Sequence, residues 1–386
     1  MITQTKDLIA FCQKLKGTPF VTVDTEFMRE STYYPLLCLV QVAGPDDTVA
    51  AIDALAPGID LAPLFDLMNA PETLKVFHAA RQDLEIFYHL MKKVPAPLFD
   101  SQVAAMVCGF GDQVGYENLI GKLTNARIDK SSRFTDWSRR PLSERQITYA
   151  LSDVTHLRDA YRKLQSQLEK NERESWLTSE MNILTSPATY EGNPDLAYKR
   201  IKARHPKPRI IAILREVAAW REREAQRRDM PRNRILRDDA ILEICHHAPK
   251  SPDDLARTRG LSERVANGAS GVEILKAVAR GLSIPDADLP APEKRKDLPS
   301  GIGPVSDLIK VFLKMVCQQN DVAQKLIANA SDIDQIAAYG EKADVPAMQG
   351  WRYELFGGPA VKLRSGEMGL AIKNKKVILL ENSDTE

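Results

Sequence analysis

The first 170 residues alternate between two kinds of hydrophobic pattern. Residues 19–27, PFVTVDTEF, alternate with period two and carry β-branched side chains, which predicts a strand. Further strands are expected at 36–44, 48–53 and 74–79, with helices at 61–71, 81–93 and 144–172. The last of these is apolar at 147, 151, 154, 157, 161, 164 and 168, which is the spacing of an amphipathic helix. Strands interleaved with helices indicate an α/β layered domain.

The pattern changes near residue 190. Residues 185–209 contain four prolines and many basic residues and are typical of a linker or docking segment. Helical periodicity then predicts a helix that starts at 208 and ends near Met230 and Pro231, and shorter helices up to residue 282. A second proline-rich and charged linker covers 283–304. The tail from 304 to 380 is again mostly helical and ends in a β-branched stretch at 369–380.

Composition places the chain among soluble globular proteins. It has 386 residues, of which 44% are hydrophobic and 27% charged. No apolar run approaches the roughly 20 residues of a membrane-spanning helix, and the N-terminus does not resemble a secretory signal. Five widely spaced cysteines without a CxxC pair argue against a disulfide framework or a cysteine-based zinc site. We therefore expect a cytoplasmic protein that does not bind membranes.

Charge is distributed unevenly although the formal net charge is only +1. Residues 1–100 contain 8 Lys and Arg against 13 Asp and Glu, and residues 201–250 contain 13 against 7. An acidic first part and a basic middle suggest that one part holds cations and another a polyanion. A basic helical face that is merely solvated is the alternative.

Acidic residues recur at positions that can converge. Asp24 and Glu26 are two residues apart on a predicted strand, so their carboxylates share one face with Thr22, whereas Val21, Val23 and Phe27 point to the core. Adjacent carboxylates repel each other, and a divalent cation would relieve that repulsion. Solvated acids on an edge strand are the alternative.

Two further segments supply candidates for the same site. Asp83 lies near the start of a helix, where a negative charge is tolerated in any case. Tyr149 and Asp153 are four residues apart on the long helix and lie on one face, off its apolar stripe. Both could simply face solvent. Alternatively, Asp153 binds a metal while the neutral Tyr149 phenol orients a water molecule.

The order and spacing of VDTEF, HAARQDLEIF and YALSDVTHL resemble the DEDD exonucleases, in the branch that has a tyrosine four residues before the last aspartate. The flanking text of residues 20–165 is similar to the ribonuclease D family. The resemblance implies an α/β ribonuclease H-like exonuclease domain, in which helices flank a mixed sheet. It also implies that Asp24, Glu26, Asp83 and Asp153 hold two divalent metal ions, Mg²⁺ or Mn²⁺, and that Tyr149 helps to place the attacking water.

The same resemblance implies the reaction. Two-metal hydrolysis from the 3′ end of RNA would release nucleoside 5′-monophosphates, and the family's substrates include tRNA precursors. Phe27 resembles a position that wedges against the terminal bases. Residues 130–140 combine Lys130, Arg133, Arg139 and Arg140 with Trp137, a mixture that suits single-stranded RNA. A surface loop anchored by the tryptophan is the alternative there. Asp100 is interpreted as structural or as a support for the site residues. His78 is interpreted as a buried residue at a strand end, and an approach to the site is the alternative.

Residues 206–282 resemble the HRDC domain, most specifically in WREREAQRRDMPRNRIL at 220–236. That resemblance implies nucleic-acid contact, for which Arg232, Arg234 and Arg237 are the best phosphate-binding candidates. Docking of these arginines against the exonuclease domain is the alternative. The expected organisation is an exonuclease domain at 1–190, an HRDC domain at 205–285 and a second small all-α domain of HRDC type at 300–380. A monomer suffices, since helical domains can clamp RNA within one chain.

Three other functions compete with a 3′→5′ exoribonuclease. A DNA 3′→5′ exonuclease would use the same acids and the same HRDC segment. A non-catalytic RNA-binding adaptor would bind metal without turnover. A helicase accessory module is the weakest reading, because the sequence has no GxxxxGK[ST] phosphate loop.

Overall fold

The computed structural model describes residues 1–128, 135–204, 206–291 and 298–381. Contacts between residues divide the chain into two units. Unit 1 combines residues 1–26 and 39–189 with the C-terminal part, and unit 2 combines residues 27–38 with the segment that follows 189. Residues 27–38 thus group with the helices that follow residue 189 and not with the rest of the N-terminal α/β segment.

A mixed sheet forms the centre of unit 1. Within the described residues its strand order is β3-β2-β1-β4-β5. β2 and β3 form an antiparallel hairpin, and β4 runs parallel to both β1 and β5. The bounds are β1 (Phe20–Met28), β2 (Leu36–Ala43), β3 (Val49–Asp53), β4 (Leu74–Phe77) and β5 (Leu98–Asp100). The predicted strands and the hairpin turn after Ala43 are therefore confirmed.

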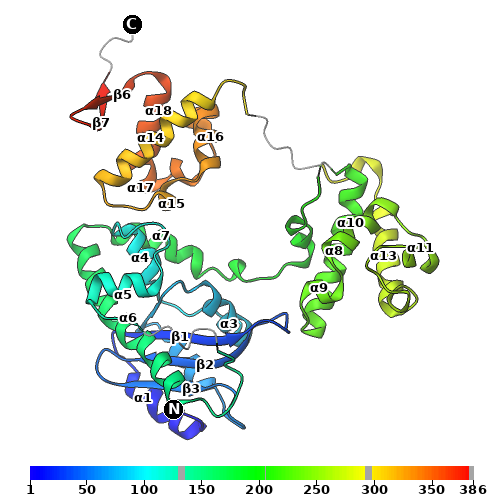
Figure 1. Cartoon of the computed structure of the whole chain (residues 1–386), viewed down its shortest axis with the longest axis horizontal. Helices are drawn as coiled ribbons and strands as arrows, with labels where there is room; N and C mark the ends of the chain where they lie inside the picture. The colour runs from blue at the N-terminus through cyan, green and yellow to red at the C-terminus, as the bar shows by residue number, and fades with distance from the viewer. Residues whose placement is uncertain (129–134, 205, 292–297, 382–386) are drawn as a thin grey trace. The chain divides into compact units, whose positions relative to one another are not determined.

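Helices cover the sheet, as the α/β pattern predicts. α6 crosses the sheet and contacts both β3 and β4 (Figure 1). Its capping box at Ser143 and Gln146 fixes where it begins. The helices of this segment are α1 (Thr5–Leu15), α2 (Ala62–Asn69), α3 (Arg81–Met91), α4 (Ser101–Val107), α5 (Tyr116–Thr124), α6 (Glu144–Lys170) and α7 (Glu174–Leu184).

The end of β1 departs from the predicted pattern. Val21 and Val23 are fully buried, as their alternation indicates. Phe27 is only half-buried, so the prediction that it faces the core is wrong. Phe27 lies near the end of β1, well beyond Phe20 to Thr22, where β4 pairs with β1.

Lys75 on β4 is a fully buried cation with three partners. Its Nζ donates hydrogen bonds to the carbonyl oxygens of Ala70, Thr73 and Ala96 at 2.7, 2.8 and 2.5 Å. It thus ties β4 to the turns that precede β4 and β5. Such a group is stable in the core only because every donor is used.

Replacing Lys75 with Met should destabilise the protein strongly. The variant keeps the side-chain length but leaves three carbonyl oxygens without donors, which costs about 3 kcal/mol and lowers Tm by roughly 6–10 °C. Thermal unfolding measured by circular dichroism checks this, with the exposed Lys6→Met as control. Equal Tm values for the two variants would contradict the structural role of Lys75.

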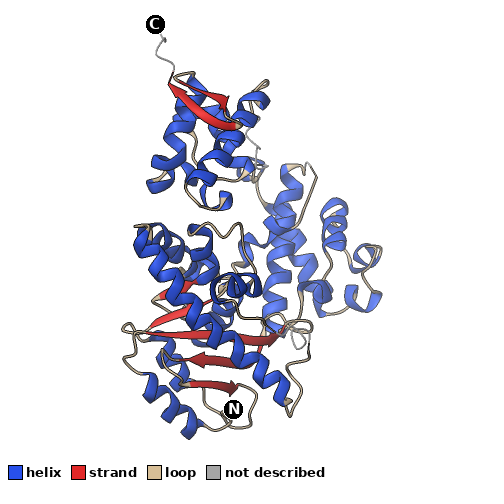
Figure 2. Ribbon diagram, turned by 60° about the vertical axis from the view of Figure 1, so that its left-hand side comes forward, coloured by secondary structure: helices blue, strands red, loops and turns tan. Residues whose placement is uncertain are grey.

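The described residues of unit 2 that follow residue 189 are helical and have their own apolar core. That core includes Val217, Ile241 and Ile274, which come from three different helices. Its elements are the 3₁₀ helix η2 (Pro194–Arg200) and α8 (Pro208–Arg228), α9 (Arg232–Ile235), α10 (Asp238–His247), α11 (Pro252–Ala256), α12 (Glu263–Ala266) and α13 (Ala269–Ser283). The helices expected between 208 and 282 are confirmed (Figure 2).

The C-terminal part is helical and then forms a β-hairpin. It contains α14 (Gly303–Gln319), α15 (Gln324–Ile327), α16 (Ala330–Tyr339), α17 (Gly350–Arg352), α18 (Gly358–Ser365), β6 (Met368–Lys373) and β7 (Lys376–Glu381). The all-α expectation therefore does not extend to its last residues. A two-residue turn with positive φ at Asn374 and Lys375 and flanking β-branched residues favour the antiparallel ribbon.

Aromatic stacking joins the C-terminal part to the α/β segment of unit 1. The rings of Trp176 and Trp351 stack with centroids 4.1 Å apart and an interplanar angle of 6°. Arg173 lies over the Trp176 ring, and Arg352 binds Glu180.

No helix of the described residues is both long and apolar enough to cross a membrane.

Candidate active site

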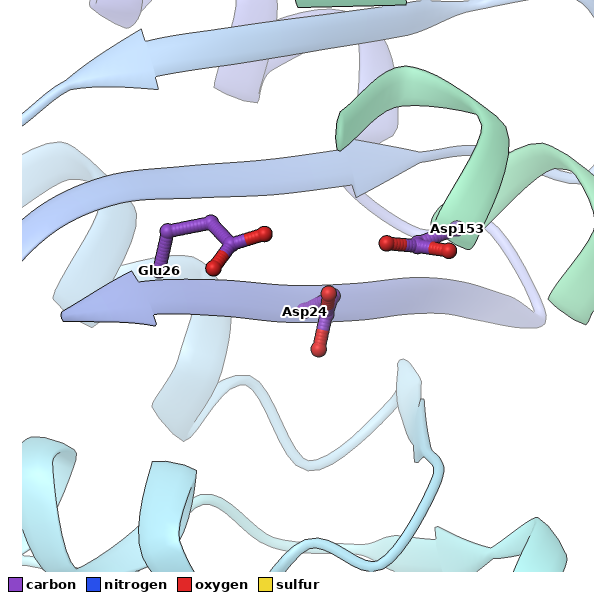
Figure 3. Close-up of side chains that lie close together, drawn as sticks. All are labelled: Asp24, Glu26 and Asp153. Atoms are coloured by element: carbon purple, nitrogen blue, oxygen red, sulfur yellow. The ribbon is translucent and has the colours of Figure 1, made fainter. Parts of the chain in front are cut away.

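Three carboxylates converge where α6 meets β1. Asp24 and Glu26 project from the same face of β1, and Asp153 approaches from α6 (Figure 3). One carboxylate oxygen from each lies within 4.8 Å of the other two. The Thr22 hydroxyl, on the same face, donates to the carbonyl oxygen of Val154 at 2.8 Å. That hydrogen bond holds this turn of α6 against β1 and thereby positions Asp153.

Asp83 completes the set from the first turn of α3. It is 7% exposed, and the Thr25 hydroxyl donates a hydrogen bond to one of its carboxylate oxygens. Asp24 is close enough to raise the pKa of Asp83 by repulsion, in addition to the effect of burial. Thr25 carries no sequence signal for this contact, because a threonine between two acids has an ordinary strand propensity.

The four acids are electrostatically frustrated without a counterion. Burial raises the pKa of Asp24 to about 6. Burial, followed by repulsion from Asp24, Asp153 and Asp83, raises the pKa of Glu26 to about 10. A carboxyl group with a pKa of about 10 holds its proton at neutral pH unless a cation replaces it, whereas one with a pKa of about 6 is only partly protonated there. Clustered carboxylate oxygens are the ligands that Mg²⁺ and Mn²⁺ prefer, so these residues fit a divalent metal site.

The frustration predicts a stability effect in the metal-free protein. The raised pKa of Glu26 means that its contribution to stability is complete below about pH 4.5 and is lost as the pH rises toward 10. Glu26→Gln mimics the protonated group at every pH. In EDTA at pH 8 we therefore expect its Tm to exceed that of the wild type by about 3 °C or more, with little difference at pH 5.

A pH series of thermal melts in EDTA measures this effect. The exposed Glu354→Gln in the same unit serves as the control and should follow the wild type at each pH. A variant Tm below that of the wild type at pH 8 would show that Glu26 is not frustrated. Saturating Mg²⁺ should reverse the order, because Gln is the weaker ligand.

Tyr149 is held beside Asp153 by an aromatic neighbour. Its ring stacks on Trp137 with centroids 6.2 Å apart. Burial and the charge of Asp153 raise the pKa of Tyr149 above its usual value, so the phenol remains a neutral donor. Trp137 itself is 3% exposed, which favours the anchoring alternative over direct stacking on RNA.

Asp24, Asp153 and Tyr149 line a cavity of about 350 Å³. Its wall also includes His78, Tyr116 and Asn118, which the sequence analysis did not assign to the site. The Tyr116 hydroxyl donates to the backbone carbonyl of Asp153 and so fixes that turn of α6. His78 is half-buried and contacts Ser101 through Nδ1 at 2.9 Å. The start of α5 carries no motif, so only tertiary structure brings Tyr116 here.

Asp100 has the structural role that the sequence analysis gave it. Its carboxylate accepts hydrogen bonds from the backbone N–H groups of Ala79, Ala80, Gln102 and Val103. It therefore caps α4 and fixes the turn between β4 and α3. That turn carries Ala79 in a left-handed conformation and leads directly to Asp83.

The basic residues expected to bind RNA are scattered. Lys130 and Arg133 lie outside the described residues. Arg139 is exposed and pairs with Asp136 at 3.2 Å. The Arg140 guanidinium forms two hydrogen bonds with the buried Asp53, at 2.6 and 2.8 Å. Arg140 thus anchors its loop to the end of β3, which supports the alternative of a structural loop at this position.

In unit 2, Arg232 and Arg234 differ in their surroundings. Arg232 binds Glu222 at 2.5 and 2.6 Å and lies over the ring of Tyr33. Arg232 therefore holds residues 27–38 against the helices of unit 2. This agrees with the alternative that the arginine has a docking role and does not bind phosphate. Arg234 is exposed. Contact of Arg234 with phosphate stays a prediction.

Comparisons with known proteins define the class of this fold and site. A family model described as 3′-5′ exonuclease matches residues 1–169, and a model of the HRDC domain matches residues 211–278. The chain is 50% identical to ribonuclease D of Gluconacetobacter diazotrophicus over 377 residues, which cover 98% of this chain and 95% of that protein. It is 49% identical to ribonuclease D of Nitrobacter hamburgensis over 383 residues, or 99% and 100% of the two chains.

A solved structure agrees with these relatives. The crystal structure of Escherichia coli RNase D, described as an exoribonuclease involved in structured RNA processing, matches with a TM-score of 0.81 and 30% identity. The match covers 95% of this chain and 98% of that one. The chain is a 3′→5′ exonuclease joined to an HRDC segment. It belongs to the ribonuclease D family and is an exoribonuclease.

Proposed function

We propose that this exoribonuclease hydrolyses RNA from its 3′ end with two divalent metal ions and trims tRNA precursors. The convergence of Asp24, Glu26 and Asp153, with Asp83 beside them, is the observation that carries the proposal. Bound Mg²⁺ or Mn²⁺ would neutralise charge on the attacking and leaving oxygens. The tRNA assignment rests on the family alone, with the structured-RNA role of the Escherichia coli enzyme as support.

The residues of the chain have separate tasks in this reaction. The four acids would hold the metal ions through their ionised carboxylates. Tyr149 donates a hydrogen bond that orients the attacking water, because its phenol stays protonated. Phe27, half-buried next to Glu26, contacts the terminal bases. Trp137 and Tyr116 act through Tyr149 and Asp153 and are positioning residues.

The bond that breaks determines the products. Water adds its oxygen to the scissile phosphorus, and the bond from phosphorus to the 3′ oxygen breaks. The shortened strand keeps that oxygen and gains a proton, which gives a new 3′-hydroxyl. The released nucleotide keeps the phosphate as a 5′-monophosphate.

The test uses a tRNA precursor labelled at the phosphate before its last nucleotide. We expect the label to leave as a nucleoside 5′-monophosphate in Mg²⁺ and the trailer to shorten faster than the folded tRNA body. Label released as inorganic phosphate or as a longer fragment would contradict the proposed bond cleavage. Equal shortening of an unstructured RNA and of the tRNA body would remove the support for tRNA trimming. Equal cutting of DNA would favour a general 3′→5′ exonuclease.

A further inference from the structure

The first turn of α5 forms part of the wall of the active-site cavity. Residues 115–118, at the start of this helix, line the same space of about 350 Å³ that Asp24, Tyr149 and Asp153 line. This volume is at the lower end of the range for small-ligand sites, which is the scale of one nucleotide and not of a longer strand. The start of α5 is therefore placed to contact a single nucleotide in the cavity.

Tertiary contacts hold this turn of α5 in place. The Tyr116 hydroxyl donates a hydrogen bond to the backbone carbonyl of Asp153, and the His78 ring packs against the Tyr116 ring with centroids 5.3 Å apart. The two residues that follow Asn118 are fully buried. Asn118 itself is exposed. Its backbone is thus fixed relative to Asp153, while its side chain is accessible from the cavity.

Asn118 differs from the other neutral polar side chains of the cavity wall in having an unused amide. The His78 ring is hydrogen-bonded to a serine hydroxyl and to a backbone group. The Tyr116 hydroxyl is used on Asp153, and the Tyr149 hydroxyl orients the attacking water in the proposed reaction. Within the described residues, the side-chain amide of Asn118 forms no hydrogen bond. Its donor and its acceptor are both available to a ligand.

The chemistry of this amide matches a sugar hydroxyl. A carboxamide offers a donor and an acceptor, and a ribose 2′-hydroxyl is also both. The 2′-hydroxyl is the group by which a protein distinguishes RNA from DNA at a given position. In the proposed reaction the scissile phosphate lies at Asp24 and Asp153, and it is joined to the 5′ carbon of the ribose that leaves. That ribose therefore enters the cavity that Asn118 lines.

We propose that Asn118 hydrogen-bonds the 2′-hydroxyl of the 3′-terminal ribose and thereby contributes to the selection of RNA over DNA. The inference rests on the proposed function for the placement of the terminal nucleotide. A site that hydrogen-bonds a substrate hydroxyl discriminates against an analogue without it, because the polar group of the site then loses water and gains no partner.

The test compares the removal of the first nucleotide from two short unstructured RNAs in Mg²⁺. They differ only in the terminal 2′-hydroxyl, which one of them lacks. The ratio of the two kcat/KM values measures the preference for a terminal ribose. We expect a ratio of about 10 for the wild type and of about 2 for Asn118→Ala, since one hydrogen bond is lost. Equal ratios for the two proteins would overturn the proposal.

A third RNA separates the hydrogen bond from the shape of the sugar. A terminal 2′-fluoro group keeps the ribose-like pucker but has no proton to donate. The wild type should cleave this RNA more slowly than the terminal ribose, and Asn118→Ala should cleave the two at nearly the same rate. Wild-type cleavage of the 2′-fluoro RNA at the full ribose rate would mean that the pucker is recognised, which would contradict the role of Asn118.

A matched control separates Asn118 from asparagine loss in general. Asn171 is exposed at the end of α6, about 27 Å along the helix axis from Asp153. Asn171→Ala should keep the wild-type ratio, and a ratio as low as that of Asn118→Ala would overturn the proposal. Thermal melts verify that each variant is folded.

Nucleotide binding keeps this proposal apart from the proposed function, because it needs no turnover. Uridine 5′-monophosphate and 2′-deoxyuridine 5′-monophosphate are titrated calorimetrically in Mg²⁺. We expect the wild type to bind the ribonucleotide about 5-fold more tightly and Asn118→Ala to bind the two nearly equally. Equal Kd values in the wild type would overturn the assignment of Asn118. A wild type that removes no nucleotide from any RNA would count against the proposed function, whereas these Kd values would still decide the role of Asn118.

Discussion

Asp24→Asn is expected to lower the turnover number by about 10³-fold or more while RNA affinity stays within about threefold. The substitution preserves shape but removes one negative charge from the three carboxylates that lie within 4.8 Å of each other. Metal-assisted charge neutralisation contributes several kcal/mol to such hydrolysis, and each 1.4 kcal/mol is a factor of ten. Single-turnover cleavage and fluorescence anisotropy on one RNA measure the two quantities.

The exposed Asp46→Asn is the matched control for this prediction. Asp46 lies in the turn between β2 and β3, where it accepts from the Thr48 N–H at 3.0 Å. Its replacement removes the same charge at a distance from the cluster and should leave the rate unchanged. An Asp24→Asn protein that retains a tenth of the wild-type rate would exclude Asp24 as a metal ligand.

Tyr149→Phe is expected to have the second largest effect, a loss of about 10²-fold in kcat with little change in KM. The change removes one hydroxyl and almost no volume, so the stacking on Trp137 persists. A preorganised hydrogen-bond donor in an active site contributes about this much to the rate. Metal affinity should not change, because the four carboxylates remain.

Steady-state kinetics and the Mg²⁺-dependence of Tm test both parts of the Tyr149 prediction. Tyr161→Phe on the same helix is the control, since the Tyr161 ring packs on Phe20 and Phe99 away from the acids. It should retain the wild-type kcat. A Tyr149→Phe protein with the wild-type kcat would mean that the phenol is only a packing group.

The sequence predicts the strand that carries Asp24 and Glu26, because the alternation of its side chains depends only on neighbouring residues. Period-two alternation alone places Asp24 and Glu26 on one face, and the structure confirms this. The long helix is more ambiguous. Asp153 lies outside the apolar stripe of that helix, which predicts an exposed side chain. In the structure the residue is only 7% exposed. The contact between Thr22 and Val154 orients that turn, and such a contact across 132 residues has no local signature.

The basic residues show the same limit more clearly. A charge run near an aromatic residue favours RNA contact, yet Arg140 binds Asp53 and Arg232 binds Glu222. Whether an arginine faces solvent or pairs with a buried carboxylate depends on residues far away in the sequence. The docking of Tyr33 against Glu222, 189 residues later, is of the same kind. Motif resemblance supplies the chemistry of the site, but only tertiary structure supplies its supporting contacts.

A time course on a 5′-labelled single-stranded RNA with a free 3′-hydroxyl tests the central claim most directly. Reactions run in Mg²⁺, in Mn²⁺ and in EDTA, beside a DNA of the same sequence. We predict a ladder that shortens from the 3′ end, requires metal and is absent on DNA. Shortening that persists in EDTA, or tight binding without shortening in Mg²⁺, would contradict a metal-dependent 3′→5′ exoribonuclease at Asp24, Glu26, Asp83 and Asp153.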